Sequence, residues 1–214
     1  MNQVVQFIIN RDAEGLRRAL SNDPSLANAG IPIPGDPHEN ERLGHPLHRL
    51  CDAVFAGLIT ETEAIDVARV FLEHGADIDG YKARGDINTP LSASAGLNAE
   101  TLALFYLQQG ADFLYVEPKG GSTALHWAAI CGLDRLVREL IEKGAEINRR
   151  DRTYNATPVD WAAYAMSTDD KASLHHQMDC IRVLLAAGAD RALLSEETRR
   201  MLSEAAEGDE GLSG

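Results

Sequence analysis

The sequence is poor in cysteine and has no long apolar run. Three cysteines, Cys51, Cys131 and Cys180, stand among 214 residues. Such an odd and sparse set does not make a disulfide framework, so we expect reduced thiols and a cytoplasmic location. No apolar stretch approaches the ~18 to 20 residues that cross a bilayer. The first residues, MNQVVQFIINRDAEG, lack the basic segment and long apolar core of a secretory signal, so we expect no export and no membrane partner.

Basic residues are also scarce. The chain has 20 lysines and arginines against 33 aspartates and glutamates, and its formal net charge is −13. A surface this acidic repels the phosphates of nucleic acids, so we expect no nucleic-acid partner. It would attract a basic protein, although an acidic surface with no particular partner is the plainer interpretation.

Known catalytic signatures are missing as well. The sequence contains no GxxxxGK[ST] phosphate loop, no GxGxxG after a strand, no GxSxG and no HExxH. We therefore expect a protein that is not an enzyme and needs no cofactor.

What the sequence does contain is two phrases that alternate four times. The first phrase is HPLHRLCDAV, TPLSASAGLN, TALHWAAICG and TPVDWAAYAM, which begin at His45, Thr89, Thr123 and Thr157. The second phrase is VARVFLEHGADID, TLALFYLQQGADFL, LVRELIEKGAEIN and CIRVLLAAGADRA, and it contains one glycine each time, at Gly75, Gly110, Gly144 and Gly188. The three threonines are spaced by 34 residues, so the chain is an array of internal repeats.

Each repeat predicts two helices followed by a projecting loop, which we call a finger. In the third copy, Thr123 can cap a short first helix, and Gly144 supplies the left-handed residue that ends the second. The second helix carries an apolar stripe made of Leu133, Leu136, Val137, Leu140 and Ile141. One such unit cannot bury its stripe alone, so successive units are expected to stack.

The same columns of the repeat are apolar in every copy. Four residues before each glycine stand Phe71, Tyr106, Leu140 and Leu184, and eight residues before it stand Val67, Leu102, Leu136 and Cys180. These columns predict the core.

These phrases resemble the ankyrin repeat, with its T-P-L-H-x-A signature and period of about 33 residues. The resemblance covers about residues 45–192. It implies an all-α solenoid of helix-turn-helix repeats with short β-hairpin or finger loops. It also implies a non-enzymatic module that binds another protein through its finger row and concave groove.

We predict a single repeat domain over residues 1–204. It comprises a degenerate cap at 1–28, a long loop at 29–44, repeats at about 45–79, 89–114, 123–148 and 157–192, and a capping helix at about 195–204. Residues 205–214 are expected to be a flexible tail. The proline-rich loop at 29–44 is either a contact element or a linker.

Two copies carry extra residues between their helices. In the first, Thr60 is followed three residues later by Glu63, a capping-box pattern that predicts a longer second helix. In the other, MSTDDKASLHHQM predicts a longer second helix that starts near Ser167. Neutral insertion in a surface turn fits both equally well.

His126 and Cys131 raise the question of a reactive site in TALHWAAICG. The resemblance implies a structural hydrogen-bonding role for His126, and His48 occupies the same column. Cys51 and Cys180 stand in small or apolar columns. The resemblance implies that Cys131 stands at the end of its helix that faces the concave groove. A thiol- or metal-dependent enzyme or redox sensor, which would use Cys131 or the histidine groups, is therefore the alternative function.

Two groups of residues have a composition that zinc sites use. They are His45, His48 and Cys51, with His38 upstream, and His175, His176 and Cys180. Repeat columns already account for His48, Cys51 and Cys180, so we expect no metal.

The fingers concentrate tyrosine and basic side chains, which are enriched at interaction hot spots. The predicted partner-binding residues are Tyr81, Lys82, Arg84, Tyr115, Lys119, Ile130, Arg149, Arg150, Arg152, Tyr154 and Tyr164. We expect an acidic or polar protein segment to lie against the arginines at 149–152, with Tyr154 and Tyr164 as anchors. Alternatively, these arginines pair with neighbouring aspartates in a solvated finger.

The sequence thus predicts a protein-binding module that is monomeric when free. A narrower version is an inhibitor or immunity-type protein that neutralises a basic enzyme.

Overall fold

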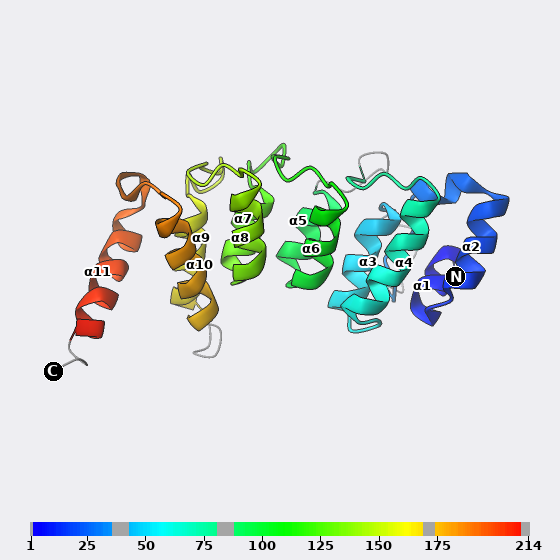
Figure 1. The fold of residues 1–214 in the computed structure, drawn as a ribbon, viewed down its shortest axis with the longest axis horizontal. Coiled ribbons are helices and arrows are strands. Elements are labelled where there is room, and N and C mark those ends of the chain that lie inside the picture. Colours follow the sequence, from blue (N-terminus) through cyan, green and yellow to red (C-terminus); the bar gives the residue numbers. More distant parts are fainter. Residues whose placement is uncertain (1, 36–42, 81–87, 169–173, 211–214) are drawn as a thin grey trace. The chain divides into compact units, whose positions relative to one another are not determined.

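The computed structural model describes residues 2–35, 43–80, 88–168 and 174–210 (Figure 1). Within these residues the chain forms eleven α-helices, two 3-10 helices and no strand. It divides into two compact units, Met1–Tyr115 (unit 1) and Val116–Gly214 (unit 2). The predicted all-α architecture of helix pairs is confirmed. None of the described helices is long and apolar enough to cross a membrane.

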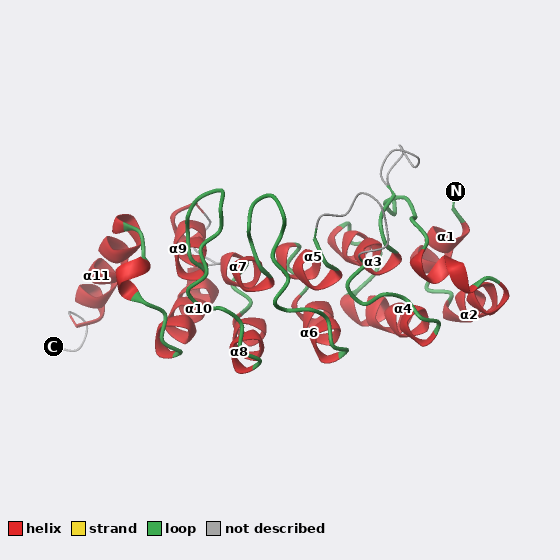
Figure 2. Cartoon of the chain, turned by 90° about the horizontal axis from the view of Figure 1, so that it is seen from above, coloured by secondary structure: helices red, strands yellow, loops and turns green. Residues whose placement is uncertain are grey.

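Unit 1 arranges its later helices in two rows. The helices of this unit are α1 Gln3–Asn10, α2 Ala13–Asn22, η1 Pro24–Asn28, α3 Pro46–Phe55, α4 Glu61–Glu73, α5 Pro90–Gly96 and α6 Glu100–Gln108. Along the rows, α3 packs on α5 and α4 on α6, and across them α3 packs on α4 and α5 on α6 (Figure 2). Each pair is one helix-turn-helix repeat.

Unit 2 repeats this pattern. Its helices are α7 Ala124–Ile130, α8 Asp134–Glu142, α9 Pro158–Thr168, α10 Leu174–Ala186, η2 Arg191–Leu193 and α11 Glu196–Glu210. Along the rows α7 packs on α9 and α8 on α10, and α11 packs against α9. The loops that precede α7 and α9 project beyond the row of first helices (Figure 2).

The first helices begin at the repeat threonines or at a residue that replaces one. Before α5, Thr89 Oγ1 accepts a hydrogen bond from the Ser92 backbone N–H at 3.2 Å. Before α3, the ring of His45 has this role, and its Nδ1 accepts from the Leu47 N–H at 3.3 Å. His45 is therefore a helix cap that stands in the threonine column.

The predicted capping box before α4 is confirmed. Thr60 Oγ1 accepts from the Glu63 N–H at 3.3 Å, and Glu63 Oε2 accepts from the Thr60 N–H at 2.8 Å. The box starts a helix of 13 residues, whereas α6 has 9. The inserted residues thus lengthen the second helix, as predicted.

The prediction that a second helix starts near Ser167 is wrong. Ser167 lies inside α9, and α10 begins at Leu174. After Pro158, the α9 segment has no glycine or proline to stop it, so the first helix continues for 11 residues where α7 has 7. The insertion therefore lengthens both helices of this pair, since α10 has 13 residues.

Glycines end the second helices, and the predicted columns form the core. Gly75, Gly110, Gly144 and Gly188 have φ angles of 83°, 91°, 94° and 99°. The positions four and eight residues before them are at most 1% exposed in Val67, Phe71, Leu102, Tyr106, Leu136, Leu140, Cys180 and Leu184. The repeat thus buries the same two positions of each second helix.

The segments at the two ends of the array have their own features. Ile31 and Gly44 exchange two backbone hydrogen bonds of 2.9 Å, which close the base of the long loop, while residues 36–42 lie outside the described part. At the other end, α11 continues to Glu210, past the predicted helix end near 204 and into the predicted tail. A single domain over 1–204 stays a prediction.

Candidate binding pocket

A pocket of about 440 Å³ lies on the surface of unit 2. It is formed by α7, α9, the finger before α9 (residues 149–156, the second finger) and the residue before α11. The lining residues are Trp127, Ile130, Tyr154, Ala156, Asp160, Trp161, Tyr164 and Ser195. Four of them are aromatic and one is acidic, a composition suited to a ligand with an apolar or delocalised surface.

The aromatic rings of the pocket meet at steep angles. The ring planes of Trp127 and Trp161 are inclined by 85° with centroids 5.1 Å apart. Tyr154 is inclined to Trp161 by 71° at 6.3 Å. Edge-to-face contacts of this kind are favourable. The rings therefore form a corner and not a flat stack.

One carboxylate, that of Asp151, fixes both the second finger and one tryptophan. Its Oδ1 accepts from the N–H groups of Thr153 and Tyr154 at 2.8 and 2.7 Å. Its Oδ2 accepts from the Ala156 N–H at 3.1 Å and from Trp161 Nε1 at 3.0 Å. Burial alone would raise the pKa of Asp151, but these hydrogen bonds lower it overall, so the group is ionised at neutral pH.

A second carboxylate, that of Asp160, ties the start of α9 to the start of α11. Its Oδ2 accepts from the N–H and hydroxyl of Thr157, both at 2.9 Å. Its Oδ1 accepts from the Ser195 N–H at 2.9 Å and the Thr198 hydroxyl at 2.7 Å. Burial raises the pKa of Asp160, yet the hydrogen bonds outweigh burial and lower it, so the pocket wall carries a negative charge.

His126 contacts the second finger through its ring. Its Nδ1 lies 3.2 Å from the Thr123 backbone N and 2.9 Å from the Thr123 hydroxyl, and its Nε2 lies 3.3 Å from the Ala156 carbonyl oxygen. Burial lowers the pKa of His126 to about 4, and the Ala156 hydrogen bond and the Asp151 charge act in the opposite direction. A neutral ring with both nitrogens engaged is a structural group, which is the role the resemblance implied.

The turn at residues 117–122 (the first finger) is fastened to the second finger by Arg152. The Arg152 backbone N–H donates to the Gly120 carbonyl at 2.6 Å. Its Nη2 donates to the carbonyls of Glu117 and Pro118 at 2.9 and 2.5 Å. Gly121, with φ 78°, permits this approach, because a Cβ there would lie 2.9 Å from the Arg152 nitrogen.

Three of the predicted binding residues come together in the pocket. Tyr154 and Tyr164 line it with 74% and 64% of their surface exposed, and the half-buried Ile130 lies beside them. The structure thus brings two of the predicted aromatic residues and the predicted aliphatic residue to one pocket, and their role in binding stays a prediction.

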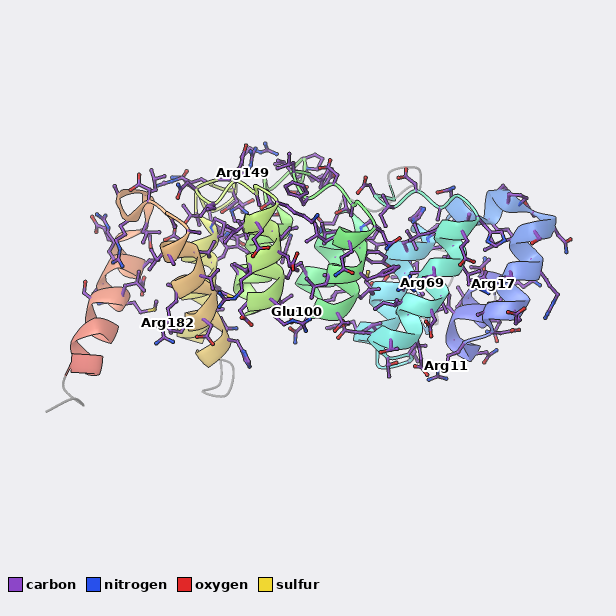
Figure 3. The ribbon with its side chains drawn as sticks, in the orientation of Figure 1. Arg11, Arg17, Arg69, Glu100, Arg149 and Arg182 are labelled. Carbon is purple, nitrogen blue, oxygen red and sulfur yellow. The ribbon has the colours of Figure 1, made fainter. Side chains whose placement is uncertain are left out.

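The predicted arginines make contacts within unit 2. Arg149 lies at the finger end of the unit and pairs with Glu146 at 2.5 Å (Figure 3). Arg150 donates to the carbonyls of Leu193 and Asn155. With Arg152, all three guanidinium groups have acceptors inside the chain, so the arginines help to shape the finger.

The remaining predicted residues are not among the lining residues or fall outside the described residues. The half-buried Tyr115 belongs to unit 1, where its N–H donates to the Asp112 carbonyl at 3.3 Å. Lys119 is exposed on the first finger. Tyr81, Lys82 and Arg84 fall in residues 81–87, which are not described.

Five lining residues were not predicted from the sequence: Trp127, Ala156, Asp160, Trp161 and Ser195. A signal for the tryptophans was present, because the chain's only two tryptophans stand 34 residues apart in one repeat column. Each is followed three residues later by a predicted groove residue, Ile130 or Tyr164, on the same helical face. No comparable signal marked Ser195, since its place depends on how the chain turns before α11.

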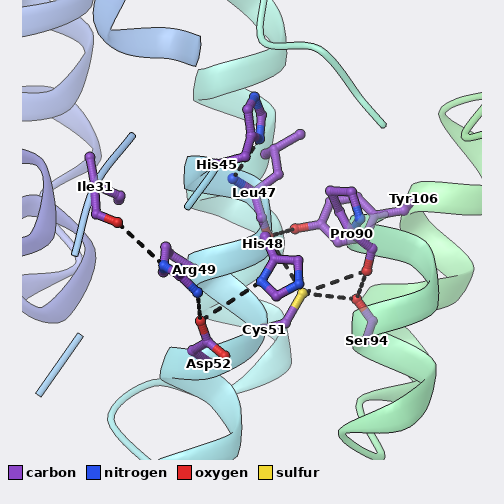
Figure 4. Close-up of polar contacts among 10 residues, drawn as sticks. All are labelled: Ile31, His45, Leu47, His48, Arg49, Cys51, Asp52, Pro90, Ser94 and Tyr106. Carbon is purple, nitrogen blue, oxygen red and sulfur yellow. Dashed lines mark hydrogen bonds and ion pairs between the residues drawn. The ribbon is translucent and has the colours of Figure 1, made fainter. Parts of the chain in front are cut away.

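Unit 1 contains a polar cluster around α3, and its contacts are internal (Figure 4). Arg49 donates to the Ile31 carbonyl at 3.3 Å and pairs with Asp52 at 2.6 Å, and His48 Nδ1 lies 3.8 Å from Asp52. Burial raises the pKa of Asp52, but contacts with His48 and Arg49 lower it overall. The cluster anchors the long loop to α3.

The histidines and the cysteine of the first zinc-like group contact different partners. His45 Nε2 lies 3.1 Å from Asn28 Oδ1. The Cys51 thiol lies 3.1 Å from Ser94 Oγ and 3.4 Å from the Leu47 carbonyl (Figure 4). Across residues 2–35, 43–80, 88–168 and 174–210, no three His, Cys, Asp or Glu residues gather in a way that could hold a metal ion. None of the three cysteines, all of which lie in the described residues, forms a disulfide.

Comparisons with known proteins agree with the repeated helix pairs. A family model described as "Ankyrin repeats (3 copies)" matches residues 58–151 and 91–195. The chain is 28% identical over 178 residues to "Ankyrin repeat and SOCS box protein 6" of Pongo abelii and of Homo sapiens. The protein of the same name from Mus musculus is 30% identical over 131 residues, which is 61% of this chain and 29% of the relative.

The extent of these matches matters for what they show. The first two alignments cover 82% of this chain but 38% of each relative, so the chain spans well under half the length of those proteins. The family model, in contrast, covers more than half of the chain. Together with the helix pairs, it shows that the chain belongs to the ankyrin repeat family.

Proposed function

We propose that this chain binds a protein partner through the aromatic pocket of unit 2. Ankyrin repeats indicate a protein–protein interaction module. The observation that supports the pocket as the contact point is the exposure of Tyr154 and Tyr164 on its walls, 74% and 64%. Tyrosines that are rigidly placed and exposed are typical binding hot spots.

The two fingers of unit 2 serve as a preformed rim. Asp151, Arg152 and Gly121 hold them in one arrangement before a partner arrives. A preordered loop loses less conformational entropy on binding than a mobile one. Arg149 and Lys119 supply rim contacts for polar or acidic groups of the partner, as the sequence suggested.

A narrower form of the proposal is an inhibitor or immunity-type protein with a basic enzyme as its target. The net charge of −13 supports it, because a strongly acidic binder attracts a basic partner over long distances. The test is whether a stoichiometric amount of the chain abolishes the activity of the partner.

The alternative of a thiol- or metal-dependent enzyme gains no support. Both ring nitrogens of His126 are engaged by Thr123 and Ala156, so neither is left to activate Cys131. Ankyrin repeat proteins are generally interaction modules. The proposed binder is non-enzymatic and cytoplasmic, and it is monomeric when no partner is bound.

The pocket is tested with the double variant Tyr154→Ala/Tyr164→Ala. The partner is captured from lysate with the wild-type chain, identified by mass spectrometry, purified, and titrated against each variant. We expect the double variant to bind at least about tenfold more weakly. Phe55→Ala, which truncates a 70% exposed aromatic residue of unit 1, is the matched control and is expected to bind as the wild type does. Unchanged affinity of the double variant would remove the pocket from the interface.

A further inference from the structure

We infer that the occupant of the pocket is the side chain of an arginine on the partner protein. This inference rests on the proposed function and specifies which chemistry the pocket recognises. It is carried by the arrangement of the aromatic rings and of two carboxylates around them.

The rings offer what a guanidinium group needs. A cation is attracted to the face of an aromatic ring, most strongly to tryptophan, and arginine makes this contact more often than lysine does. Trp127 and Trp161 meet at 85° and Tyr154 meets Trp161 at 71°, so the pocket has several ring walls at a corner. Its volume of about 440 Å³ leaves room for a guanidinium and part of its stem.

The carboxylates add negative charge where the occupant would lie. Asp160 lines the pocket directly. Asp151 accepts a hydrogen bond from Trp161 Nε1 at 3.0 Å, which draws the indole N–H towards a negative charge and makes the ring face a better partner for a cation. The finger cations Lys119, Arg149 and Arg150 are not among the lining residues. Arg149 pairs with Glu146, and Arg150 donates to the carbonyls of Leu193 and Asn155.

An apolar occupant fits these features less well. Asp160 already accepts four hydrogen bonds, and covering it with a hydrocarbon side chain would remove its remaining contact with water without adding a partner, which costs free energy. A guanidinium offsets that charge while its flat faces still contact the rings. Charge complementarity therefore favours arginine over leucine or phenylalanine.

The two tryptophans make the pocket directly observable. They are the only tryptophans of the chain and both line the pocket, so under folding conditions tryptophan fluorescence and the two indole N–H signals in NMR spectra respond to its occupation. The probes are Gly-Gly-Xaa-Gly-Gly peptides, acetylated and amidated, in which Xaa is arginine, citrulline or leucine. Citrulline has the shape of arginine without its charge.

We expect the arginine peptide to bind at least about fivefold more tightly than the citrulline and leucine peptides, a preference that decreases with added salt. Tyr164→Leu removes a ring but keeps an apolar side chain at an exposed position. It should weaken the arginine peptide about fivefold and leave the leucine peptide within about twofold. Phe55→Leu, outside the pocket, is the control, and circular dichroism checks that all variants are folded.

Equal binding of arginine and citrulline, tighter binding of leucine, or no response to any peptide would each overturn the inference. These outcomes are separate from the test of the proposed function. If Tyr154→Ala/Tyr164→Ala abolishes partner binding while leucine is the preferred peptide, the pocket is the contact point and only its occupant is wrong. If that variant binds the partner normally, the proposed function fails whatever the peptides do.

Discussion

His126, Asp151 and Asp160 are buried polar side chains whose hydrogen-bonding capacity is used within unit 2. A buried polar group without a partner would destabilise the fold by ~1 to 3 kcal/mol, so each of these groups is placed by its partners. Their pKa values follow from the same contacts: burial dominates for the imidazole, and hydrogen bonds dominate for the two carboxylates.

The lowered pKa of His126 makes the stability of unit 2 dependent on pH. The folded ring takes up a proton only near pH 4, whereas the unfolded ring does so near 6.5. Between these values the unfolded chain binds more protons, so lowering the pH favours unfolding. We expect a loss of about 2 kcal/mol in the free energy of unfolding between pH 7.5 and pH 5, measured by urea titration with tryptophan fluorescence.

The variant His126→Gln should abolish this pH dependence, whatever its stability at pH 7.5. His176→Gln, at an exposed position on α10, is the matched control and should keep it. The carboxylates do not interfere, because groups whose pKa lies below 3.8 lose their contribution only at lower pH. An equal slope in wild type and His126→Gln would contradict the assignment.

The helices could largely be predicted because the repeat specifies them locally. The threonine column gives the starts, the glycine column gives the ends, and the apolar columns give the core. The predicted helix start near Ser167 is wrong because the insertion there has no threonine or glycine of the repeat to mark a helix boundary. After Pro158, no glycine or proline stops α9 before residue 168. There, helix length depends on packing between α9 and its neighbours, which no short pattern encodes.

The candidate site was predictable only in part for a related reason. Ile130, Tyr154 and Tyr164 stand in repeat columns or on a finger, and their exposure follows from that placement. The finger arginines suggested a charged surface, yet Arg150 and Arg152 donate to carbonyl oxygens of segments up to 43 residues away in the sequence. Contacts of this kind depend on the tertiary path of the loops.

Two glycines of unit 2, one at a helix end and one in a finger, are expected to differ in how much an added Cβ destabilises the fold. Gly144 has φ 94° and open space where a Cβ would lie, whereas Gly121 has φ 78° and the Arg152 nitrogen 2.9 Å from that position. We expect Gly144→Ala to cost about 1 kcal/mol through backbone strain alone. Gly121→Ala should cost about 2 to 3 kcal/mol, because a clash between the fingers is added.

Urea unfolding of both variants, followed by tryptophan fluorescence, measures this difference. Amide hydrogen exchange of the second finger gives an independent readout, since only Gly121→Ala should accelerate it. Equal effects of the two substitutions on the free energy of unfolding would contradict the prediction, because the contact between the two fingers would then add nothing to stability.

At the scale of the whole molecule, the net charge is the property that bears on how a partner approaches. The net charge is −13, while the described finger arginines are occupied by internal acceptors. The net charge makes the long-range field negative, whereas the short-range recognition that we propose lies at the aromatic pocket. The two contributions are expected to act on different rate constants.

With a basic partner, we expect the association rate constant to fall about tenfold or more between 0.05 and 0.5 M salt, because ions screen the attraction. The dissociation rate constant should change little. Tyr154→Ala/Tyr164→Ala should do the opposite, with faster dissociation and an unchanged salt slope. Surface plasmon resonance measures both, and an association rate that is independent of salt would contradict a basic target.

The Asp151 carboxylate has a mechanical consequence. It accepts hydrogen bonds both from the backbone of the second finger and from the indole of Trp161. If the finger moves away together with Asp151, the hydrogen bond to the indole breaks. Movement of this finger and reorientation of the Trp161 ring are therefore expected to be coupled. A partner is therefore expected to encounter the finger and the Trp161 wall of the pocket either both in place or both displaced.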